Sequence, residues 1–242
     1  MDHTDTSTPT DQDAGLPSRR AREARGMTDY WDARSVDYDA THEVADRDTW
    51  KEVLEGLVGS DRTLRILDVA TGTGLIANLL AEHGYTKVTG TDLSEGMMRF
   101  AREHAAAQGL DVDYRFGNAL DLPLPDASFD VVINSRLLWT LTEADPAIRE
   151  WARVLAPGGT LIAINELEPG EGIRTGPLAD YRTKIQAGEL PLANADIDEI
   201  LAALTGAGLR DVRLRHLPGC HLVKRDRENW YAFTATKGAE NR

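Results

Sequence analysis

The sequence predicts an α/β fold with a mostly parallel sheet and helices on both of its faces. From about residue 48 to residue 168, segments with apolar residues at helical spacing alternate with short apolar runs that are typical of buried strands. Strands that alternate with helices at this interval imply βαβ units and therefore a parallel sheet. Near the end of the chain two strand-like segments follow one another without a helix between them, so we expect them to pair antiparallel.

The individual elements follow from these patterns. Apolar or alternating runs predict strands at residues 63–69, 87–93, 111–117, 129–135, 160–168, 210–217 and 229–237. Helical spacing predicts helices at residues 48–59, 75–84, 94–109, 145–159 and 196–209. Ser94 is a suitable N-cap for the helix that it precedes, and Gly59, Gly84 and Gly109 are suitable stops.

Composition limits the class of protein. The chain has 242 residues, which fits a single α/β domain, and 27 basic and 40 acidic residues give it a formal charge of −13. An acidic body repels nucleic-acid phosphates and anionic membranes, so we expect neither as a partner. The single cysteine, Cys220, excludes an internal disulfide, and the six histidines have no ligand spacing, so we expect no metal site. We find no signal peptide and no apolar run that approaches a membrane span, which favours a cytoplasmic location.

The first 26 residues differ from the rest of the chain. They are polar, rich in Thr, Asp and Arg, and they lack hydrophobic periodicity. Because they offer little apolar surface for burial, we expect residues 1–26 to form a disordered tail and residues 27–242 to form one domain.

A glycine turn marks the candidate binding site. The first buried strand ends near Asp68 and runs through Gly72 and Gly74 into a helix, which places a crevice at the carboxyl end of the sheet. Asp92 ends the second strand and is suited to hold ribose hydroxyls in that crevice. Nicotinamide dinucleotides and S-adenosylmethionine are both bound at such turns. The carboxylate of Asp68 would repel a pyrophosphate, whereas it suits the ammonium group of S-adenosylmethionine.

Four segments of the sequence resemble, in order, the motifs of a known family. "ILDVATGTG", "VTGTDLSEGMM", "GNALDLPLPDASFDVV" and "REWARVLAPGGTLI" are similar to the successive motifs of class I S-adenosylmethionine-dependent methyltransferases. Within that family they resemble the branch of small-molecule methyltransferases that includes the quinone-biosynthesis (type 11) enzymes. The signature of those quinone enzymes after the fourth strand is replaced here by "NSRLLWTL". The resemblance implies a Rossmann-like sheet of seven strands in the order 3-2-1-4-5-7-6, with strand 7 antiparallel.

The resemblance also implies a cofactor and its site. S-adenosyl-L-methionine would be the methyl donor and S-adenosyl-L-homocysteine the product. The positions expected to contact the cofactor are Tyr30, Tyr38, Asp68, Ala70, Thr71, Gly72, Gly74, Asp92, Leu93, Met97, Asn118, Ala119, Leu120 and Asn134. Asp68 and the glycine turn would surround the methionine part, Asp92 the ribose and Asn118 the adenine. Two positions depart from the family pattern, because Ala70 stands where glycine is usual and Asn118 where aspartate is frequent.

The acceptor site is expected from the same resemblance. Residues 27–60 would contain N-terminal lid helices, and residues 167–195 would form an insertion over the acceptor. The residues expected to contact the acceptor are Trp31, Arg136, Trp139, Tyr181 and Arg182. His216, His221 and Glu166 lie at or after strand ends that face the crevice and are candidates for a catalytic base, and a packed or solvated side chain is the alternative for each.

The predicted function is transfer of a methyl group from S-adenosylmethionine to a nitrogen or oxygen of a small polar molecule by in-line displacement. We expect a monomer or a homodimer. Two other classes stay open. One is a nicotinamide-dependent oxidoreductase, which would bind a reduced dinucleotide and not S-adenosylhomocysteine. The other is an inactive partner protein that binds the cofactor, against which the intact set of Asp68, Gly72, Gly74 and Asp92 argues.

Overall fold

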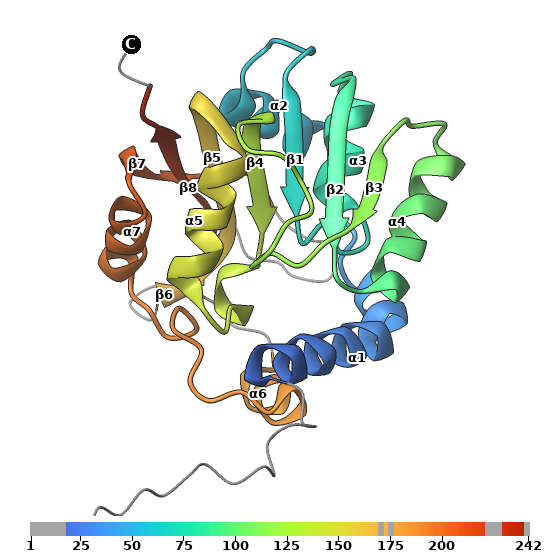
Figure 1. Ribbon diagram of the computed structural model, residues 1–242. Helices are drawn as coiled ribbons and strands as arrows, with labels where there is room; N and C mark the ends of the chain where they lie inside the picture. Colours follow the sequence, from blue (N-terminus) through green and yellow to red (C-terminus); the bar gives the residue numbers. More distant parts are fainter. Residues whose placement is uncertain (1–17, 169–171, 174–176, 221–228, 240–242) are drawn as a thin grey trace, which may run out of the picture.

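The computed structural model describes residues 18–168, 172–173, 177–220 and 229–239. Within these residues, seven strands lie side by side in the order β3-β2-β1-β4-β5-β8-β7, and a short β6 pairs with the end of β5 (Figure 1). The strands are β1 (Arg65–Val69), β2 (Lys87–Asp92), β3 (Asp113–Phe116), β4 (Phe129–Ser135), β5 (Leu155–Glu168), β6 (Gly172–Ile173), β7 (Leu209–His216) and β8 (Trp230–Lys237). The first five are parallel, and β8 is antiparallel to both β5 and β7. The expected order, with its one antiparallel strand, is confirmed.

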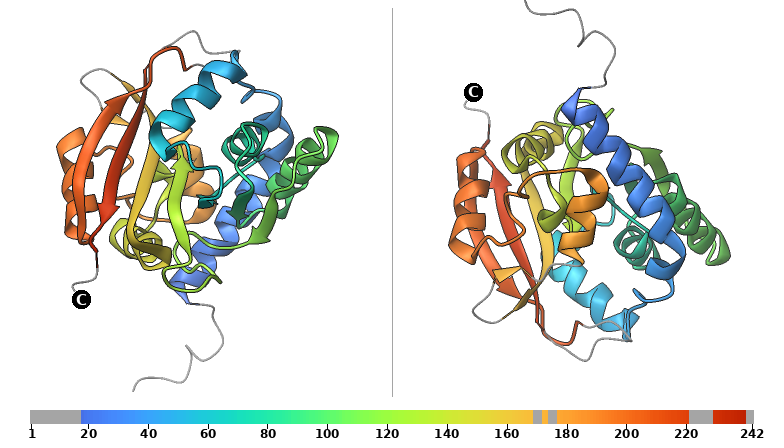
Figure 2. Two further views of the ribbon diagram at one scale, coloured as in Figure 1. Left: turned by 90° about the horizontal axis from the view of Figure 1, so that it is seen from above. Right: turned by 90° about the horizontal axis from the view of Figure 1, so that it is seen from below.

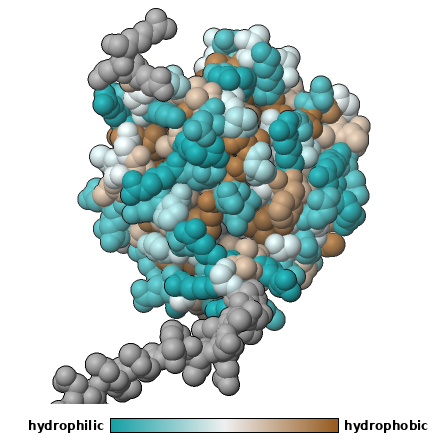
Figure 3. Space-filling view, viewed as in Figure 1, coloured by the Kyte–Doolittle hydropathy of each residue, from teal (hydrophilic) through white to brown (hydrophobic). Residues whose placement is uncertain are grey.

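Helices cover both faces of the sheet. One face carries α2 (Arg47–Val58), α3 (Leu75–Glu82) and α4 (Glu95–Ala107), and the other carries α5 (Ala144–Val154) and α7 (Ile197–Gly206), as Figure 2 shows from above. The outer surface over α5 and α7 is mostly hydrophilic, with apolar side chains showing between the polar ones (Figure 3). Because both faces of the sheet are buried, its parallel strands appear in the sequence as continuous apolar runs.

Helix α1 (Arg19–Asp39) begins at Arg19 rather than near residue 27, so the expectation of a disordered segment was wrong for residues 19–26. Glu23 is only 3% exposed and pairs with Arg19 at 2.7 Å. A Cβ atom on Gly26 would come within 2.7 Å of Ile185 Cα, so the absence of a side chain lets α1 lie against α6. Composition did not reveal this helix because its contacts use a glycine and a paired acid instead of an apolar stripe. Residues 1–17 lie outside the described part of the chain.

Two helices lie across the carboxyl edge of the sheet. In Figures 1 and 2, α1 and α6 (Leu178–Ile185) run side by side below the ends of the parallel strands. Helix α6 and strand β6 lie within the insertion expected at residues 167–195, where the sequence reasoning named no element. Tyr181 and Ile185 are four residues apart and both fully buried, so one face of α6 packs on the core. The open end of the sheet is therefore covered by two segments that lie far apart in the sequence.

Three features of the described residues bear on the function class. No helix among them is long and apolar enough to cross a bilayer. Their His, Cys, Asp and Glu side chains form no group of three that could hold a metal ion. Cys220 is a free, fully buried thiol.

Candidate functional site

Two cavities open side by side at the carboxyl edge of the sheet. The larger encloses about 720 Å³, including its mouth, and extends from the end of β2 to α6. The smaller, of about 410 Å³, lies against the end of β1 and the start of α3. Tyr38, Ala70, Ser135 and Arg136 line both cavities, so these four residues form the boundary between them.

The other lining residues fall into two halves. The glycine-turn half comes from the ends of β1 and β2 and from the loop after β3, and includes Asp68, Thr71, Gly72, Asp92, Leu93, Met97, Asn118, Ala119 and Leu120. The aromatic half comes from α1, from α6, and from the 3-10 helix η1 (Leu138–Thr140) with the residues after it, and includes Met27, Trp31, Thr140, Leu141, Thr142 and Tyr181. Most positions expected to contact the cofactor therefore line the glycine-turn half.

The turn after β1 needs unusual backbone angles. Ala70 has φ 55° and Gly72 has φ 56°, both in the left-handed region that glycine adopts without strain. Gly74 also has a positive φ, but a Cβ atom there would lie 2.5 Å from Tyr114 Oη and 2.8 Å from Ala101 Cβ, and Gly74 lines neither cavity. Gly72 is therefore explained by the backbone angles of the turn, and Gly74 by close packing at the start of α3.

Asp92 is a buried acceptor at the end of β2. It is 7% exposed, and its carboxylate accepts hydrogen bonds from Gly72 N at 2.8 Å and Ser94 N at 2.9 Å. Burial raises the pKa of this carboxyl to about 6, against the lowering effect of these backbone donors. The carboxylate ties the two turns together and faces the larger cavity.

Asp68 is a second buried carboxyl, in the smaller cavity. It is 1% exposed, and Thr71 Oγ1 donates to its Oδ2 at 2.7 Å. Burial raises the pKa of Asp68 to about 7, and the nearby Asp92 charge adds to the increase. Within the described residues no basic side chain forms an ion pair with Asp68. A cationic ligand group would supply what this environment lacks.

The loop after β3 forms an apolar wall with a fixed amide. Leu93 and Met97 line the larger cavity, together with Asn118 and the two residues that follow it. Asn118 Oδ1 accepts from Leu120 N at 3.0 Å, and Trp151 Nε1 donates to the carbonyl of Ala119 at 3.0 Å. These bonds fix the loop in a shape that suits a flat, mostly apolar ligand group.

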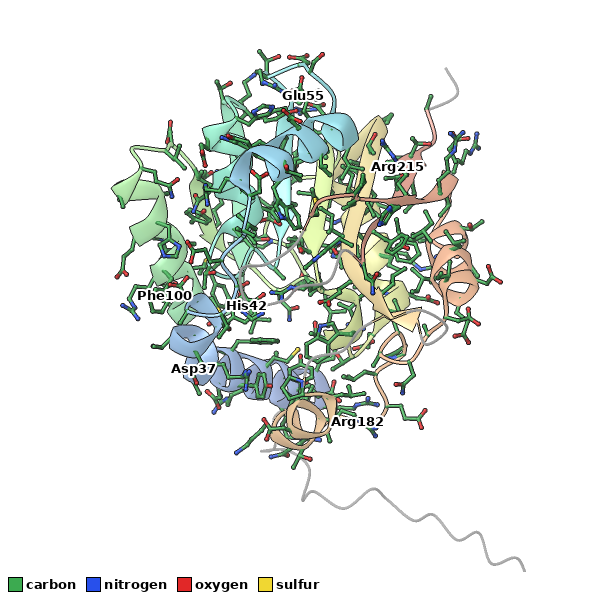
Figure 4. The ribbon with its side chains drawn as sticks, turned by 180° about the vertical axis from the view of Figure 1, so that it is seen from behind. Asp37, His42, Glu55, Phe100, Arg182 and Arg215 are labelled. Carbon is green, nitrogen blue, oxygen red and sulfur yellow. The ribbon has the colours of Figure 1, made fainter. Side chains whose placement is uncertain are left out.

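Tyr38 and Arg136 meet at the boundary between the cavities. Arg136 Nη2 donates to the Tyr38 hydroxyl, and the guanidinium carbon lies 5.0 Å from the centre of the Tyr38 ring. The Tyr38 ring also stacks on His42 with centroids 3.8 Å apart (His42 is labelled in Figure 4). Arg136 has φ 57°, and its backbone N donates to Ile164 O at 2.7 Å. This left-handed residue ends β4 as Ala70 ends β1, on the neighbouring strand.

The aromatic half is built from rings of distant segments. The Trp31 ring lies 5.9 Å from Tyr38, 6.3 Å from Trp139 and 5.8 Å from Tyr181, measured between centroids. Tyr181 donates from its hydroxyl to Thr140 O at 3.1 Å, and burial raises its pKa above the usual value. The result is an apolar chamber with a few polar groups, next to the boundary residues.

Comparison with known proteins identifies the family. A family model described as a methyltransferase domain matches residues 67–163. A curated protein of Mycolicibacterium smegmatis, named a probable S-adenosylmethionine-dependent methyltransferase, is 31% identical over 212 residues, which cover 84% of this chain and 74% of that protein. The chain belongs to the S-adenosylmethionine-dependent methyltransferases. This membership confirms the resemblance of the four motifs and decides against a nicotinamide-dependent oxidoreductase.

Two other methyltransferases match shorter parts. The demethylmenaquinone methyltransferase of Thermus thermophilus is 37% identical over 124 residues, which cover 51% of this chain and 56% of that protein. The 27-O-demethylrifamycin SV methyltransferase of Amycolatopsis mediterranei is 34% identical over 185 residues, which cover 74% of this chain and 64% of that one. The chain thus spans between about half and two thirds of these two relatives.

A solved structure supports the fold. Phosphoethanolamine N-methyltransferase 2 of Haemonchus contortus, in complex with S-adenosyl-L-methionine, superposes with a TM-score of 0.66. The match covers 93% of this chain and 61% of that one. At 18% identity, this likeness shows the fold alone.

The glycine-turn half suits the cofactor of this methyltransferase family. Asp68 is buried without a basic partner among the described residues, which fits the ammonium group of the methionine part. Asp92 has carboxylate oxygens to which ribose hydroxyls can donate, and Leu93, Met97 and Asn118 line a cavity that suits an adenine ring.

Two aromatic residues expected in the site lie behind the cavity wall. Tyr30 packs against Tyr181 with ring centroids 4.9 Å apart, and Trp139 packs against Tyr181 at 5.4 Å. Both are almost fully buried, and neither lines a cavity. Consecutive residues of a helix point in different directions, so Trp31 reaches the cavity and Tyr30 does not.

Asn134 and Arg182 also lie away from the cavities. Side chains alternate along β4, so Ser135 faces the cavities and Asn134 faces the core under α5, where Val132 also packs. Asn134 is fully buried, and its amide finds no hydrogen-bond partner among the described residues. Arg182 lies on the outer side of α6, where its Nε donates to Gly188 O at 2.8 Å (Figure 4).

None of the candidate bases that can be placed lies in a cavity wall. His216 is exposed on β7, two strands from β5, with its ring 4.9 Å from that of Tyr231. Glu166 is 3% exposed at the end of β5 but lines neither cavity. His221 falls outside the described residues. The expectation of a catalytic histidine at position 216 therefore has no support in the geometry.

Several lining residues were not anticipated. They are Met27, His42, Thr73, Leu75, Ile76, Gly117, Leu137, Thr140, Leu141, Thr142 and Trp230. Those after β4 follow from the rule that residues at the carboxyl ends of strands face the crevice. The position of Met27 and His42 depends on how α1 docks, which no local pattern in the sequence encodes.

Proposed function

We propose that this methyltransferase transfers the methyl group of S-adenosylmethionine to a small molecule bound in the aromatic half of the larger cavity. The observation that carries the proposal is the continuity of the two halves. The groups that suit the cofactor follow one another from Asp68 to Asn118, and the chamber of Trp31 and Tyr181 opens from the same cavity.

Different lining residues bind different parts of the cofactor. Asp68 holds the ammonium group of the methionine part, and the turn at Gly72 lets the backbone approach it. Asp92 accepts hydrogen bonds from the ribose, and Asn118 borders the adenine. This assignment places the reacting sulfur near Ala70, between the two carboxyls.

Methyl transfer requires that the acceptor is aligned with the cofactor and that water is kept away from the reacting groups. S-adenosylmethionine supplies a methyl group that is already activated on a sulfonium, so the protein has to orient the acceptor in line with the carbon–sulfur bond. Helices α1 and α6 lie over the open edge of the sheet, where they shield the reacting groups from solvent. Asp32 Oδ1 accepts from Gly96 N at 2.8 Å, which fastens α1 to the turn beside Asp92.

The acceptor is a small molecule with a planar part. Tryptophan and tyrosine rings in the chamber offer edges and faces to a flat ligand. The sequence-based expectation of a nitrogen or oxygen acceptor stays a prediction. The named relatives point to more than one acceptor atom, because one is named for demethylmenaquinone and the other for an O-demethylated rifamycin.

Binding and turnover test this proposal separately. Calorimetry with S-adenosylhomocysteine, without added metal, should give a dissociation constant in the micromolar range, and a reduced nicotinamide dinucleotide should give no heat. Incubation with S-adenosylmethionine labelled on its methyl group and a panel of planar small molecules should then yield a labelled product. Absence of cofactor binding by folded protein would refute the proposal. Binding without any turnover across the panel would favour the inactive partner protein instead.

A further inference from the structure

Asp68, Gly90 and Tyr114 form one row across three neighbouring strands. In the register of the sheet, Asp68 on β1 is the partner of Gly90 on β2, and Gly90 is the partner of Tyr114 on β3, the edge strand (Figure 1). Partners on adjacent parallel strands direct their side chains to the same face, so those of Asp68 and Tyr114 lie on one face of the sheet. Because a glycine stands between them, no side chain of β2 separates the two.

The ring of Tyr114 lies over this glycine. A Cβ atom on Gly90 would lie 2.7 Å from Tyr114 Cε1 and 3.0 Å from Thr71 Oγ1, so the ring and this hydroxyl fill the space that a side chain would need. The same Thr71 hydroxyl donates to the Asp68 carboxylate at 2.7 Å. A Cβ atom on Gly74 would also lie close to Tyr114, 2.5 Å from its Oη. Tyr114 therefore packs against both β2 and the glycine turn, although it lines neither cavity.

The Tyr114 hydroxyl also holds the start of α3. It donates to Asn78 Oδ1 at 2.8 Å, and Asn78 is only 3% exposed. Asn78 lies in the first turn of α3, and the residue before it, Ala77, donates its backbone N–H to the Asp68 carboxylate. Because the residues of one helical turn keep a fixed geometry, a bond that holds Asn78 also fixes the direction of the Ala77 N–H.

The surroundings of Tyr114 keep its hydroxyl a hydrogen-bond donor. Burial raises the pKa of Tyr114 well above its usual value, and the nearby charge of Asp68 adds to the increase. The phenol therefore stays protonated at neutral pH, so it can donate to Asn78 but cannot take up a proton. Its contacts suit it to orient other groups.

We propose that Tyr114 is a positioning residue for the amino-acid end of the cofactor. By donating to Asn78 and packing over Gly90, it keeps the Asp68 carboxylate oriented toward the ammonium group. This inference rests on the methyl-transfer function proposed above, in which Asp68 binds that group. The ribose and the adenine are bound by Asp92 and by the loop after β3, so they do not depend on Tyr114. Loss of its hydroxyl should therefore affect only ligands that carry the amino-acid part.

Two ligands that differ in this part test the assignment by calorimetry. Tyr114→Phe keeps the ring and removes the bond to Asn78. It should weaken S-adenosylhomocysteine at least about fivefold, and it should change the affinity for 5′-methylthioadenosine, which lacks the amino-acid part, by no more than about twofold. Tyr85→Phe is the matched control. Tyr85 is also buried and donates to a backbone carbonyl, that of Gly59, but it lies at the opposite end of β2, so both affinities should stay unchanged.

A double-mutant cycle tests whether Tyr114 acts through Asn78. Asn78→Ala removes the other partner of the same bond and keeps a residue that favours the helix, so it should weaken S-adenosylhomocysteine to a similar extent. In the Asn78→Ala background, Tyr114→Phe should then add less than about twofold. Two losses that multiply in the double variant would show that the hydroxyl does not act through α3, and would contradict the proposal.

Three further outcomes would overturn the inference. Equal weakening of both ligands by Tyr114→Phe would show a general loss of structure, and unchanged binding of both would show that Asp68 keeps its orientation without this bond. A similar loss in Tyr85→Phe would show that the effect is not specific to Tyr114. Failure of the wild-type protein to bind S-adenosylhomocysteine would instead refute the proposed function itself, because each of the other outcomes is measured against a wild type that binds.

Discussion

The glycine-turn half and the aromatic half differ in how the chain builds them. In the first, the polar groups come from residues 68–120, at the ends of adjacent strands, and backbone N–H groups hold the carboxylate of Asp92. In the second, the lining comes from three distant segments, residues 27–38, 135–142 and 178–185, and it is held by contacts between side chains. The first half is thus fixed by strand ends of the sheet, and the second by how two helices dock on it.

This difference has a functional consequence. A cofactor common to a whole family can be recognised by a rigid, local turn, whereas an acceptor that differs between relatives needs a wall that can change without altering the sheet. Variants in the two halves should therefore separate cofactor binding from acceptor binding. The predictions below test that separation.

The largest effect is expected at Asp92. Asp92→Ala removes the acceptor of two buried backbone N–H groups and of the ribose hydroxyls, so affinity for S-adenosylhomocysteine should fall by about 2 kcal/mol, or about thirtyfold. Asp92→Asn keeps one carbonyl acceptor and should do less harm. Calorimetry measures both, with the exposed Asp111→Ala as control. Unchanged binding in Asp92→Ala would mean that the carboxylate does not face the cofactor.

Removal of α1 should affect both halves at once. Deletion of residues 1–40 removes Trp31 and Tyr38 and the Asp32 contact to Gly96, and should weaken S-adenosylhomocysteine at least about tenfold, or about 1.4 kcal/mol. Deletion of residues 1–17 alone should change nothing, because α1 remains whole. Circular dichroism checks that the sheet still folds. Equal affinity of the two deletions would show that α1 packs on the site without contributing to binding.

The raised pKa of Asp68 predicts that cofactor affinity in the glycine-turn half depends on pH. Its pKa of about 7 in the free protein means that the ammonium group must displace a proton below that pH. Affinity for S-adenosylhomocysteine should therefore fall about tenfold from pH 8 to pH 6, and Asp68→Asn should remove most of this slope. Asp92, with a pKa of about 6, adds a smaller effect of the same sign.

The stability of the free protein gives an independent test of the raised pKa of Asp68. A raised carboxyl pKa means that the folded protein binds a proton that the unfolded chain, with a pKa near 4, has lost. Asp68 therefore destabilises the free protein increasingly as the pH rises from about 4 through 7. Asp68→Asn should be more stable than the wild type at pH 8, and the difference should shrink toward pH 5. A constant difference in urea denaturation would contradict the pKa assignment.

A smaller effect, confined to the aromatic half, is expected at Tyr181. Tyr181→Phe loses the hydrogen bond to Thr140 O and should lower the free energy of unfolding by about 1 kcal/mol. Affinity for S-adenosylhomocysteine should stay within about twofold of the wild type, because the ring still packs against Trp31. A larger loss of cofactor affinity would mean that the two halves are coupled through α6.

The sequence predicts these two halves unequally. The strands and helices themselves, and the residues Asp68, Gly72 and Asp92, could be placed because strand ends, turn glycines and capping residues leave local signals. The strand order and the role of Asn118 came from the resemblance to the methyltransferase family. Trp31 and Tyr181 were named, but only by resemblance. The helix at residues 19–26 was missed because its packing rests on a glycine and on a buried glutamate that pairs with an exposed arginine. The inward side of Asn134 was missed because one position along a strand reverses the face.

The smallest effect is expected at Ala70, which stands where the motif of the resembled family has glycine. At φ 55° the Cβ atom of Ala70 carries strain of about 1 kcal/mol, which Ala70→Gly would relieve, while the greater freedom of glycine in the unfolded chain costs nearly as much. The free energy of unfolding should therefore stay within about 0.5 kcal/mol of the wild type. Ala202→Gly, at an exposed position of α7 with helical angles, is the matched control and should lose about 1 kcal/mol. If Ala70→Gly loses as much as the control, the left-handed turn is not strained at this position. Because Ala70 lines both cavities, unchanged S-adenosylhomocysteine affinity in Ala70→Gly would show that cofactor binding does not need the methyl group at this position.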